Sequence, residues 1–129
     1  MTVSYDKKEK LEKTGRKLYF DGASNILGHE IGGVLVTSKG KYCPFMTRLD
    51  FNYTNNVAEY EACVMGLHAA IDKEVKELKV YGDSALVIYQ LQREWETREP
   101  RLILYHKYVT GMIKHFEEIN FNHLSQEKN

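Results

Sequence analysis

The chain has 129 residues, enough for one domain with a sizeable hydrophobic core and too few for two. Hydrophobic residues make up 43% and charged residues 28%, and no run of about 18 apolar residues predicts a membrane span or a membrane partner. The 18 basic residues balance the 18 acidic ones, which argues against a free-standing nucleic-acid binder with a basic surplus, although a neighbouring domain could supply that grip.

Residues 1–16 are polar and show no apolar periodicity, so we interpret them as a flexible lead-in to a domain that spans residues 17–129. The lead-in lacks the apolar core of a signal peptide. Cys43 and Cys63 have no metal-type spacing, which indicates a reducing, intracellular compartment, cytoplasmic or nuclear.

Three strands are expected in the first half of the domain, at residues 18–21, 33–37 and 42–49. In the first, apolar Leu18 and Phe20 alternate with more polar neighbours. The second is a β-branched run that follows a glycine-rich stretch. Pro44 cannot donate to a strand ladder, so the third strand is expected at a sheet edge.

The second half is expected to contain a helix, a strand, two helices and a strand, at residues 57–72, 77–82, 83–93, from Pro100 onward, and 119–122. Apolar residues recur at helical spacing in the first helix, at Val57, Tyr60, Val64, Leu67 and Ile71. The helix after Pro100 carries a similar stripe, at Leu102, Tyr105, Val109, Met112 and Phe116. Hairpin-connected strands followed by helical crossovers predict an α/β fold with a mixed five-stranded sheet and helices packed on it.

Asp21 has two interpretations. With Gly22 it forms a dipeptide typical of a two-residue hairpin turn. The next apolar strand begins about ten residues later, which is too far for such a turn. If the first strand continues instead, Asp21 points away from the face that carries Leu18 and Phe20.

Glu59 and Asp83 also have ordinary structural explanations. Asn56 and Glu59 have the spacing of a helix capping box, and a carboxylate in the first turn suits the helix dipole. Asp83 lies between a strand and a helix, where an N-cap aspartate belongs.

Taken together, the three carboxylates favour a different interpretation. One lies on the first strand, one at a helix start and one at the exit of the next strand, so they could converge at one edge of the sheet. Carboxylates held close together repel unless divalent cations lie among them. Phosphodiester hydrolysis by two metal ions uses that arrangement.

Three segments resemble, in order and spacing, the leading motifs of the ribonuclease H family: YFDGAS at 19–24, TNNVAEYEA at 54–62 and VYGDS at 80–84. The resemblance runs from about Lys17 to the C-terminus and is greatest with the ribonuclease H domains of plant long-terminal-repeat retrotransposon polyproteins. It implies a ribonuclease H-like fold, with elements in the order β-β-β-α-β-α-α-β. It also implies endonucleolytic hydrolysis of the RNA strand of RNA/DNA hybrids.

The resemblance implies roles for particular residues. Asp21 would bridge two Mg²⁺ ions, with Mn²⁺ as a substitute, while Glu59 and Asp83 would help to hold the ion on the leaving-group side. Contacts with the hybrid are implied for Gly22, Ala23, Ser24, Asn25, Thr54, Asn55, Asn56, Ser84 and Gln90. His123 matches a region where some members have a mobile histidine that helps product leave, although the residue equally continues the alternation of the last strand.

The family's fourth catalytic carboxylate, an aspartate in a final helix after the last strand, has no counterpart here. By this alignment it falls a few residues past Asn129, and Glu127 falls in the loop before it. The chain is therefore expected to be truncated, to lack the final helix and to leave an apolar patch of the sheet uncovered. Cleavage with Mg²⁺ is expected to be weak or absent.

Three kinds of function remain open. The first is an enzyme domain that cleaves hybrids and was once attached to a reverse transcriptase. The second is a noncatalytic ribonuclease H-fold module that binds hybrids or connects domains, which the missing carboxylate favours. The third is a phosphotransfer domain of the actin-like or recombinase type, which shares the sheet topology but would need a glycine-rich phosphate loop that this sequence lacks.

Overall fold

The computed structural model describes residues 16–25, 28–37, 39–49, 54–93 and 99–124. These residues form five strands and three helices in the predicted order: β1 (Arg16–Asn25), β2 (Gly28–Val36), β3 (Tyr42–Leu49), α2 (Asn55–Asp72), β4 (Glu77–Gly82), α3 (Ala85–Arg93), α4 (Pro100–Ile113) and β5 (Glu118–His123). The expected lead-in lies outside the described residues, except that Arg16 already belongs to β1.

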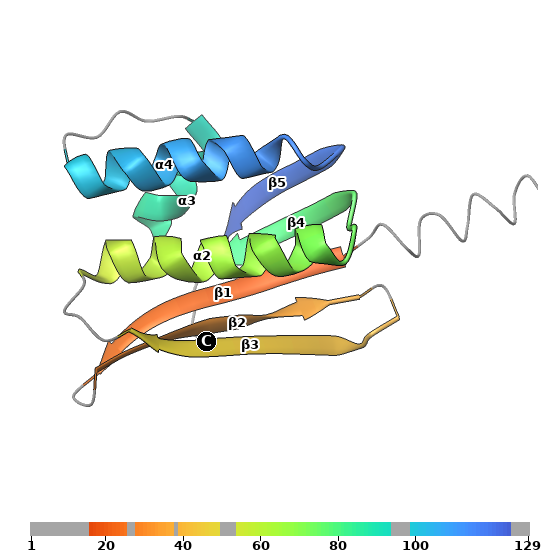
Figure 1. The fold of residues 1–129 in the computed structure, drawn as a ribbon, viewed down its shortest axis with the longest axis horizontal. Coiled ribbons are helices and arrows are strands. Elements are labelled where there is room, and N and C mark those ends of the chain that lie inside the picture. Colours follow the sequence, from red (N-terminus) through yellow and green to blue (C-terminus); the bar gives the residue numbers. More distant parts are fainter. Residues whose placement is uncertain (1–15, 26–27, 38, 50–53, 94–98, 125–129) are drawn as a thin grey trace, which may run out of the picture.

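The strands form one mixed sheet in the order β3-β2-β1-β4-β5. β2 is antiparallel to both β1 and β3, whereas β4 is parallel to both β1 and β5. Figure 1 shows α2 lying along the sheet, where it contacts β1 and β2, with α4 beside it. Pro44 lies in β3, so its predicted place at a sheet edge is confirmed.

The hairpin of β1 and β2 is longer than predicted. β2 begins at Gly28 rather than at residue 33, and Asp21 lies within β1, opposite Gly32. The hairpin-turn interpretation of Asp21 is therefore wrong. Adjacent glycines at 32 and 33 interrupt the β-branched pattern and conceal the first half of β2, because glycine has little tendency to form strands.

The core lies between the sheet and the helices. In α2, the predicted stripe is confirmed: Val57, Tyr60 and Leu67 are fully buried, while Val64 and Ile71 are partly buried against them. The buried face also includes small residues (Ala58, Ala62, Cys63, Gly66 and Ala70), which allow the helix to lie close to the sheet. A Cβ on Gly66 would be only 2.6 Å from Leu18 Cδ1.

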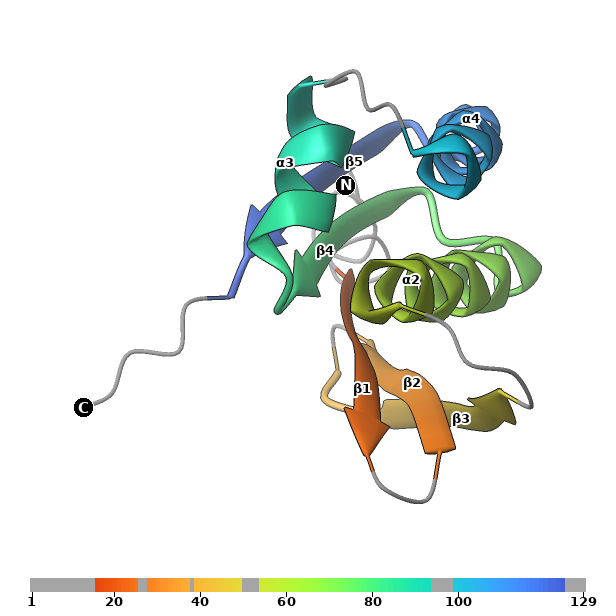
Figure 2. The ribbon, with the colours of Figure 1, turned by 90° about the vertical axis from the view of Figure 1, so that its left-hand side faces the viewer.

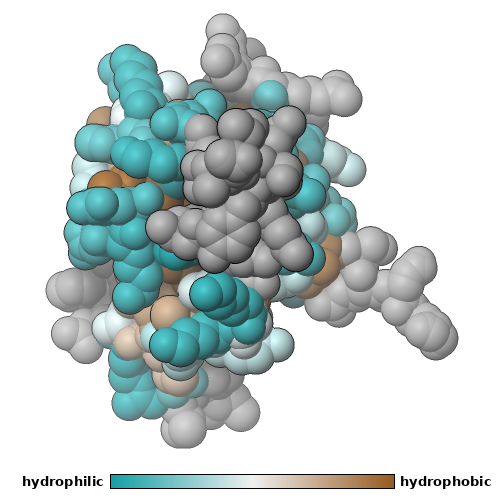
Figure 3. Space-filling view, turned by 90° about the vertical axis from the view of Figure 1, so that its right-hand side faces the viewer, coloured by the Kyte–Doolittle hydropathy of each residue, from teal (hydrophilic) through white to brown (hydrophobic). Residues whose placement is uncertain are grey.

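The predicted stripe of α4 is also confirmed. Leu102, Val109 and Met112 are buried, and Phe116 is buried in the turn after the helix. At the end of the molecule where β1 and β4 begin, the described surface is mainly hydrophilic (Figure 3). Within the described ranges, no helix is long and apolar enough to cross a membrane.

Candidate active site

Two carboxylates lie at the same end of two neighbouring parallel strands, β1 and β4. Phe20 of β1 lies opposite Gly82 of β4, so the residues that follow them, Asp21 and Asp83, are next in register. Asp21 is exposed and Asp83 is partly buried. Figure 2 looks onto this end of the molecule, where β4 ends on one side of α2 and β1 passes beside α2 before it continues toward the hairpin with β2. The carboxyl ends of parallel strands are a common place for ligand binding.

Close contact between β1 and α2 brings Glu59 to the same edge. Gly22 is buried against the second turn of α2, and a Cβ at this position would lie 2.4 Å from the carbonyl carbon of Ala58 and 2.6 Å from the nitrogen of Glu59. Any side chain at position 22 would push the helix away. The glycine therefore lets the carboxyl of Glu59 reach the backbone of Gly22 and the side chain of Asp21.

Helix capping, the competing explanation for Glu59, does not apply. Thr54 is the N-cap of α2, and its Oγ1 accepts a hydrogen bond of 3.2 Å from the backbone three residues ahead. Asn56 and Glu59 lie inside the helix, so the predicted capping box is wrong. At α3, the Oγ of Ser84 accepts the corresponding bond from the Val87 N–H at 3.3 Å.

Glu59 is a buried acid, with 7% of its surface exposed. Desolvation raises the pKa of Glu59 from 4.5 to about 7; a hydrogen bond from the Gly22 backbone opposes this rise, whereas Asp21 and Asp83 add to it. The carboxyl groups of Glu59 and Asp21 also share a hydrogen bond, which requires a proton on one of them. The metal-free site therefore holds a proton near neutral pH.

The site has the chemistry expected of a divalent-cation site. Glu59 Oε1 is buried and has no hydrogen-bond partner among the described residues. Leaving such an atom unpaired is costly, and a cation would satisfy it. Three carboxylates supply the oxygen ligands that Mg²⁺ and Mn²⁺ prefer. In the described part of the chain, no three acidic, histidine or cysteine side chains are already grouped around a single point, as expected for carboxylates that repel one another.

Polar residues surround the carboxylates at the helix starts. Thr54 and Asn55 are exposed and Asn56 is partly buried, all beside Glu59. Ser84, which is partly buried, begins α3. The structure therefore places these four predicted contact residues around the candidate site.

The remaining predicted contacts lie elsewhere or outside the description. Residues 23–25 continue β1 beyond Asp21, but their side chains are not among those described. Gln90 is only 3% exposed, and its Oε1 accepts a hydrogen bond of 2.5 Å from the Tyr60 hydroxyl. This burial does not fit the predicted contact between Gln90 and a substrate. The buried neighbours Val87 and Leu91, at helical spacing, were the sequence signal that Gln90 faces inward.

His123 ends β5 and is exposed, so its predicted place at the end of the strand is confirmed. It lies opposite Gly82, the residue before Asp83. Its ring centroid is 6.3 Å from that of Tyr89 on α3. The histidine therefore lies on the strand next to the one that delivers Asp83.

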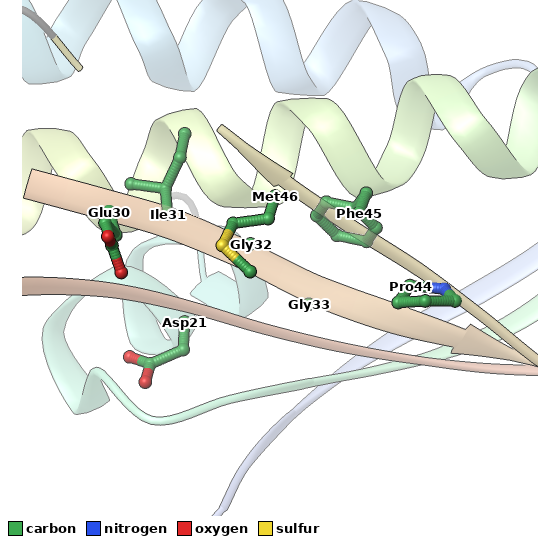
Figure 4. A pocket seen from close by; sticks show the side chains of 8 residues that line it. All are labelled: Asp21, Glu30, Ile31, Gly32, Gly33, Pro44, Phe45 and Met46. Carbon is green, nitrogen blue, oxygen red and sulfur yellow. The ribbon is translucent and has the colours of Figure 1, made fainter. Parts of the chain in front are cut away.

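A groove of about 530 Å³ extends from Asp21 across β2 and β3 (Figure 4). Glu30, which the sequence analysis did not single out, lines it together with Gly32, Pro44 and Met46. Figure 4 shows the side chains of Asp21 and Glu30 pointing to the same side of the hairpin. Glu30 therefore adds a negative charge to the groove that begins at Asp21. The strand register explains the position of Glu30. Asp21 pairs with Gly32, and Glu30 precedes Gly32 by two residues, so the two acidic side chains lie on the same face of the hairpin.

Comparison with known proteins identifies relatives of this domain. Residues 20–129 match the family described as "Reverse transcriptase-like". Ribonuclease HI of Halobacterium salinarum is 33% identical over 113 residues, which are 86% of this chain and 57% of that protein. The bifunctional protein Rv2228c of Mycobacterium tuberculosis is 32% identical over 76 residues, which are 59% of this chain and 21% of that protein. The chain thus matches only part of the length of each relative.

Solved structures agree in fold. The RNase H1 of H. salinarum superposes with a TM-score of 0.79 and 30% identity, covering 87% of this chain and 86% of that one. LC11-RNase H1, solved in complex with an RNA/DNA hybrid, superposes with a TM-score of 0.75 and 26% identity, covering 88% of each chain. The predicted ribonuclease H-like fold is confirmed. The chain belongs to the reverse transcriptase-like family, and its domain is of the ribonuclease H type.

Proposed function

We propose that the chain hydrolyses the RNA strand of RNA/DNA hybrids with the help of divalent cations held by Asp21, Glu59 and Asp83. The observation that carries this proposal is the buried, unpartnered Oε1 of Glu59, which lies with Asp21 and Asp83 at the edge of a ribonuclease H-type sheet. The hybrid as substrate is supported by the hybrid complex of LC11-RNase H1, a protein of the same fold.

Each carboxylate has a part in the proposed site. Divalent cations, held by these three residues, would supply an activated water molecule and stabilisation of the leaving oxygen. Asp21 is exposed and lies beside both other carboxylates, so it can offer oxygens to both cations. Glu59 and Asp83 flank it from the helix and from β4, on the proposed leaving-group side. Before a cation binds, the proton held at Glu59 limits the repulsion among the three groups.

The substrate would lie across the helix starts. Thr54, Asn55 and Asn56 offer polar groups beside Glu59, where 2′-hydroxyls of the RNA strand could be recognised. The backbone of residues 22–25 continues β1 past Asp21 and would face the same strand. Ser84 would contact the substrate near Asp83. His123, exposed on the neighbouring strand, would help the product leave.

These 129 residues contain three of the four carboxylates that the ribonuclease H resemblance implies. We therefore expect these residues alone to cleave hybrids weakly or not at all. The proposed metal is Mg²⁺, with Mn²⁺ as a substitute. The proposed partner is a reverse transcriptase domain in a parent polyprotein. A noncatalytic module that binds hybrids is the second candidate. It is favoured by the lack of a counterpart to the fourth carboxylate in these 129 residues.

The test is cleavage of an end-labelled RNA/DNA hybrid in Mg²⁺ and in Mn²⁺, beside an RNA duplex and an Asp21→Asn control. Cleavage confined to the hybrid and lost in the variant is the expected sign of the enzyme. If cleavage is absent, a version extended by a helix that supplies an aspartate is assayed. An extended chain that binds the hybrid but still leaves it intact would overturn the proposal and support the noncatalytic module.

A further inference from the structure

A buried hydrogen bond joins the helix that carries Glu59 to the helix that follows Asp83. The hydroxyl of Tyr60, on α2, donates to Gln90 Oε1, on α3, at 2.5 Å. Tyr60 has no exposed surface and Gln90 is 3% exposed. Burial also raises the pKa of Tyr60, so its hydroxyl remains a protonated donor.

The bond lies close to the carboxylates in the chain. Tyr60 directly follows Glu59, and Gln90 lies about two helical turns beyond Asp83. Few other contacts hold α2 and α3 together, since α2 packs mainly on the sheet and α3 mainly on β5. This pair is therefore one of the few direct ties between the two helices.

Helix α4 braces the pair from behind. The ring of Tyr60 is stacked on that of Tyr105, with centroids 5.7 Å apart. The backbone carbonyl of Gln90 lies 3.1 Å from Nε2 of His106, also on α4. The hydroxyl of Tyr105 donates to Glu61, which ties α4 to α2.

We propose that the Tyr60–Gln90 pair is a positioning element that holds Glu59 and Asp83 at the spacing that a divalent cation requires. The charge of Asp83 disfavours ionisation of Glu59, so a tie between α2 and α3 would help to hold the two carboxyl groups together when Glu59 is ionised. A buried, short hydrogen bond between neutral groups supplies such a tie without adding charge to the site. The inference rests on the proposed function of the carboxylates as cation ligands.

The test is calorimetric titration of Mn²⁺ into the wild-type chain and into Tyr60→Phe, which keeps the ring and removes only the hydroxyl. Loss of a group that orients metal ligands weakens metal binding by about tenfold or more, and we expect that loss here. Tyr105→Phe is the matched control, because it removes a hydroxyl from the same cluster and keeps both partners of the Tyr60–Gln90 bond. Its Mn²⁺ affinity is expected to stay within about twofold of wild type.

A double variant, Tyr60→Phe with Gln90→Leu, separates positioning from general stability. In Tyr60→Phe the buried amide of Gln90 has lost its hydrogen-bond partner. Replacing Gln90 by leucine removes that unpaired amide and should recover most of the resistance to urea. Mn²⁺ affinity should remain low, because the tie is still absent. Recovery of affinity in the double variant, or unchanged affinity in Tyr60→Phe, would overturn the positioning role. Absence of Mn²⁺ binding by the wild-type chain would instead overturn the proposed function itself.

Discussion

Glu59 is the residue at which burial and charge are most strongly opposed. The side chain is nearly inaccessible, one of its oxygens has no partner among the described residues, and two other carboxylates lie nearby. An arrangement of this kind lowers the stability of the metal-free protein and is typical of functional sites rather than structural ones. Its cost should be measurable as a dependence of stability on pH.

In EDTA, the free energy of unfolding should fall as the pH rises from about 4.5 to above 7. The folded-state pKa of about 7 exceeds the ordinary value of 4.5, so the folded chain binds the proton more tightly than the unfolded chain. The resulting stability is fully present below the lower pKa and lost above the higher one. At about 1.4 kcal/mol per pKa unit, the loss is about 3 kcal/mol.

Urea unfolding of wild type and Glu59→Gln at pH 5 and pH 8 measures this effect. Groups far from Glu59 contribute equally to both proteins, so the difference between them reports on the site around Glu59. The variant should be more stable than wild type at pH 8 and close to it at pH 5. Equal pH dependence of the two proteins would show that Glu59 has an ordinary pKa.

Gly22 provides a second test at the residue scale. A Cβ at this position would lie 2.4 Å from the backbone of α2, so Gly22→Ala must displace the strand or the helix. We expect unfolding free energy to fall by about 3 kcal/mol, as for overpacked cores, and Mn²⁺ binding to be lost with the displacement of Glu59.

Gly111→Ala is the matched control for that substitution. Gly111 lies in α4, and a Cβ there would have no atom within 4 Å. Alanine is the better helix former, so this change should raise stability by up to about 1 kcal/mol. A Gly22→Ala chain as stable as wild type in urea would mean that α2 is not held against β1 as described.

At the scale of elements, helix starts explain where the sequence interpretation of the site was wrong. The spacing of Asn56 and Glu59 suggested a capping box, but Thr54, two residues earlier, caps α2. Likewise the Oγ of Ser84 accepts a hydrogen bond from the backbone at the start of α3. Both segments offer more than one cap-forming residue in a row, and sequence alone cannot choose between them. Glu59 lies inside α2 and is not part of its cap.

Thr54→Ala should lower the free energy of unfolding by about 1 kcal/mol, because the Val57 N–H in the first turn of α2 loses its acceptor. Asn56→Ala is the control, since Asn56 lies inside the helix, where alanine is favourable. Urea unfolding of both variants distinguishes a cap by Thr54 from a capping box that begins at Asn56. A larger loss in Asn56→Ala than in Thr54→Ala would restore the capping box.

At the scale of the whole molecule, the order of all eight described elements was predictable from the sequence. The sequence signals used were local: alternating apolar residues for strands, helical spacing for helices, and Pro44 for an edge strand. The structure agrees with each of them. The early start of β2 was not predictable, because Gly32 and Gly33 remove the pattern that marks a strand. Pairing with β1 overrides their weak preference.

For the site, the three carboxylates could be predicted because each lies in a segment with its own motif. The burial of Gln90 could not be predicted in full, because it depends on Tyr60, a partner 30 residues away in the chain. The position of Glu30 beside Asp21 depends on strand register, which the unrecognised half of β2 concealed. Contacts between distant segments were thus the missing information.

Nuclear magnetic resonance with Mn²⁺ tests the central claim most directly, because the ion broadens the amide signals of residues close to it. We expect substoichiometric Mn²⁺ to broaden first the signals around Asp21, Glu59 and Asp83, three segments far apart in sequence. Asp21→Asn should abolish that selective broadening, and the variant should still give the dispersed signals of a folded protein. Broadening centred elsewhere, or unchanged in the variant, would contradict the account.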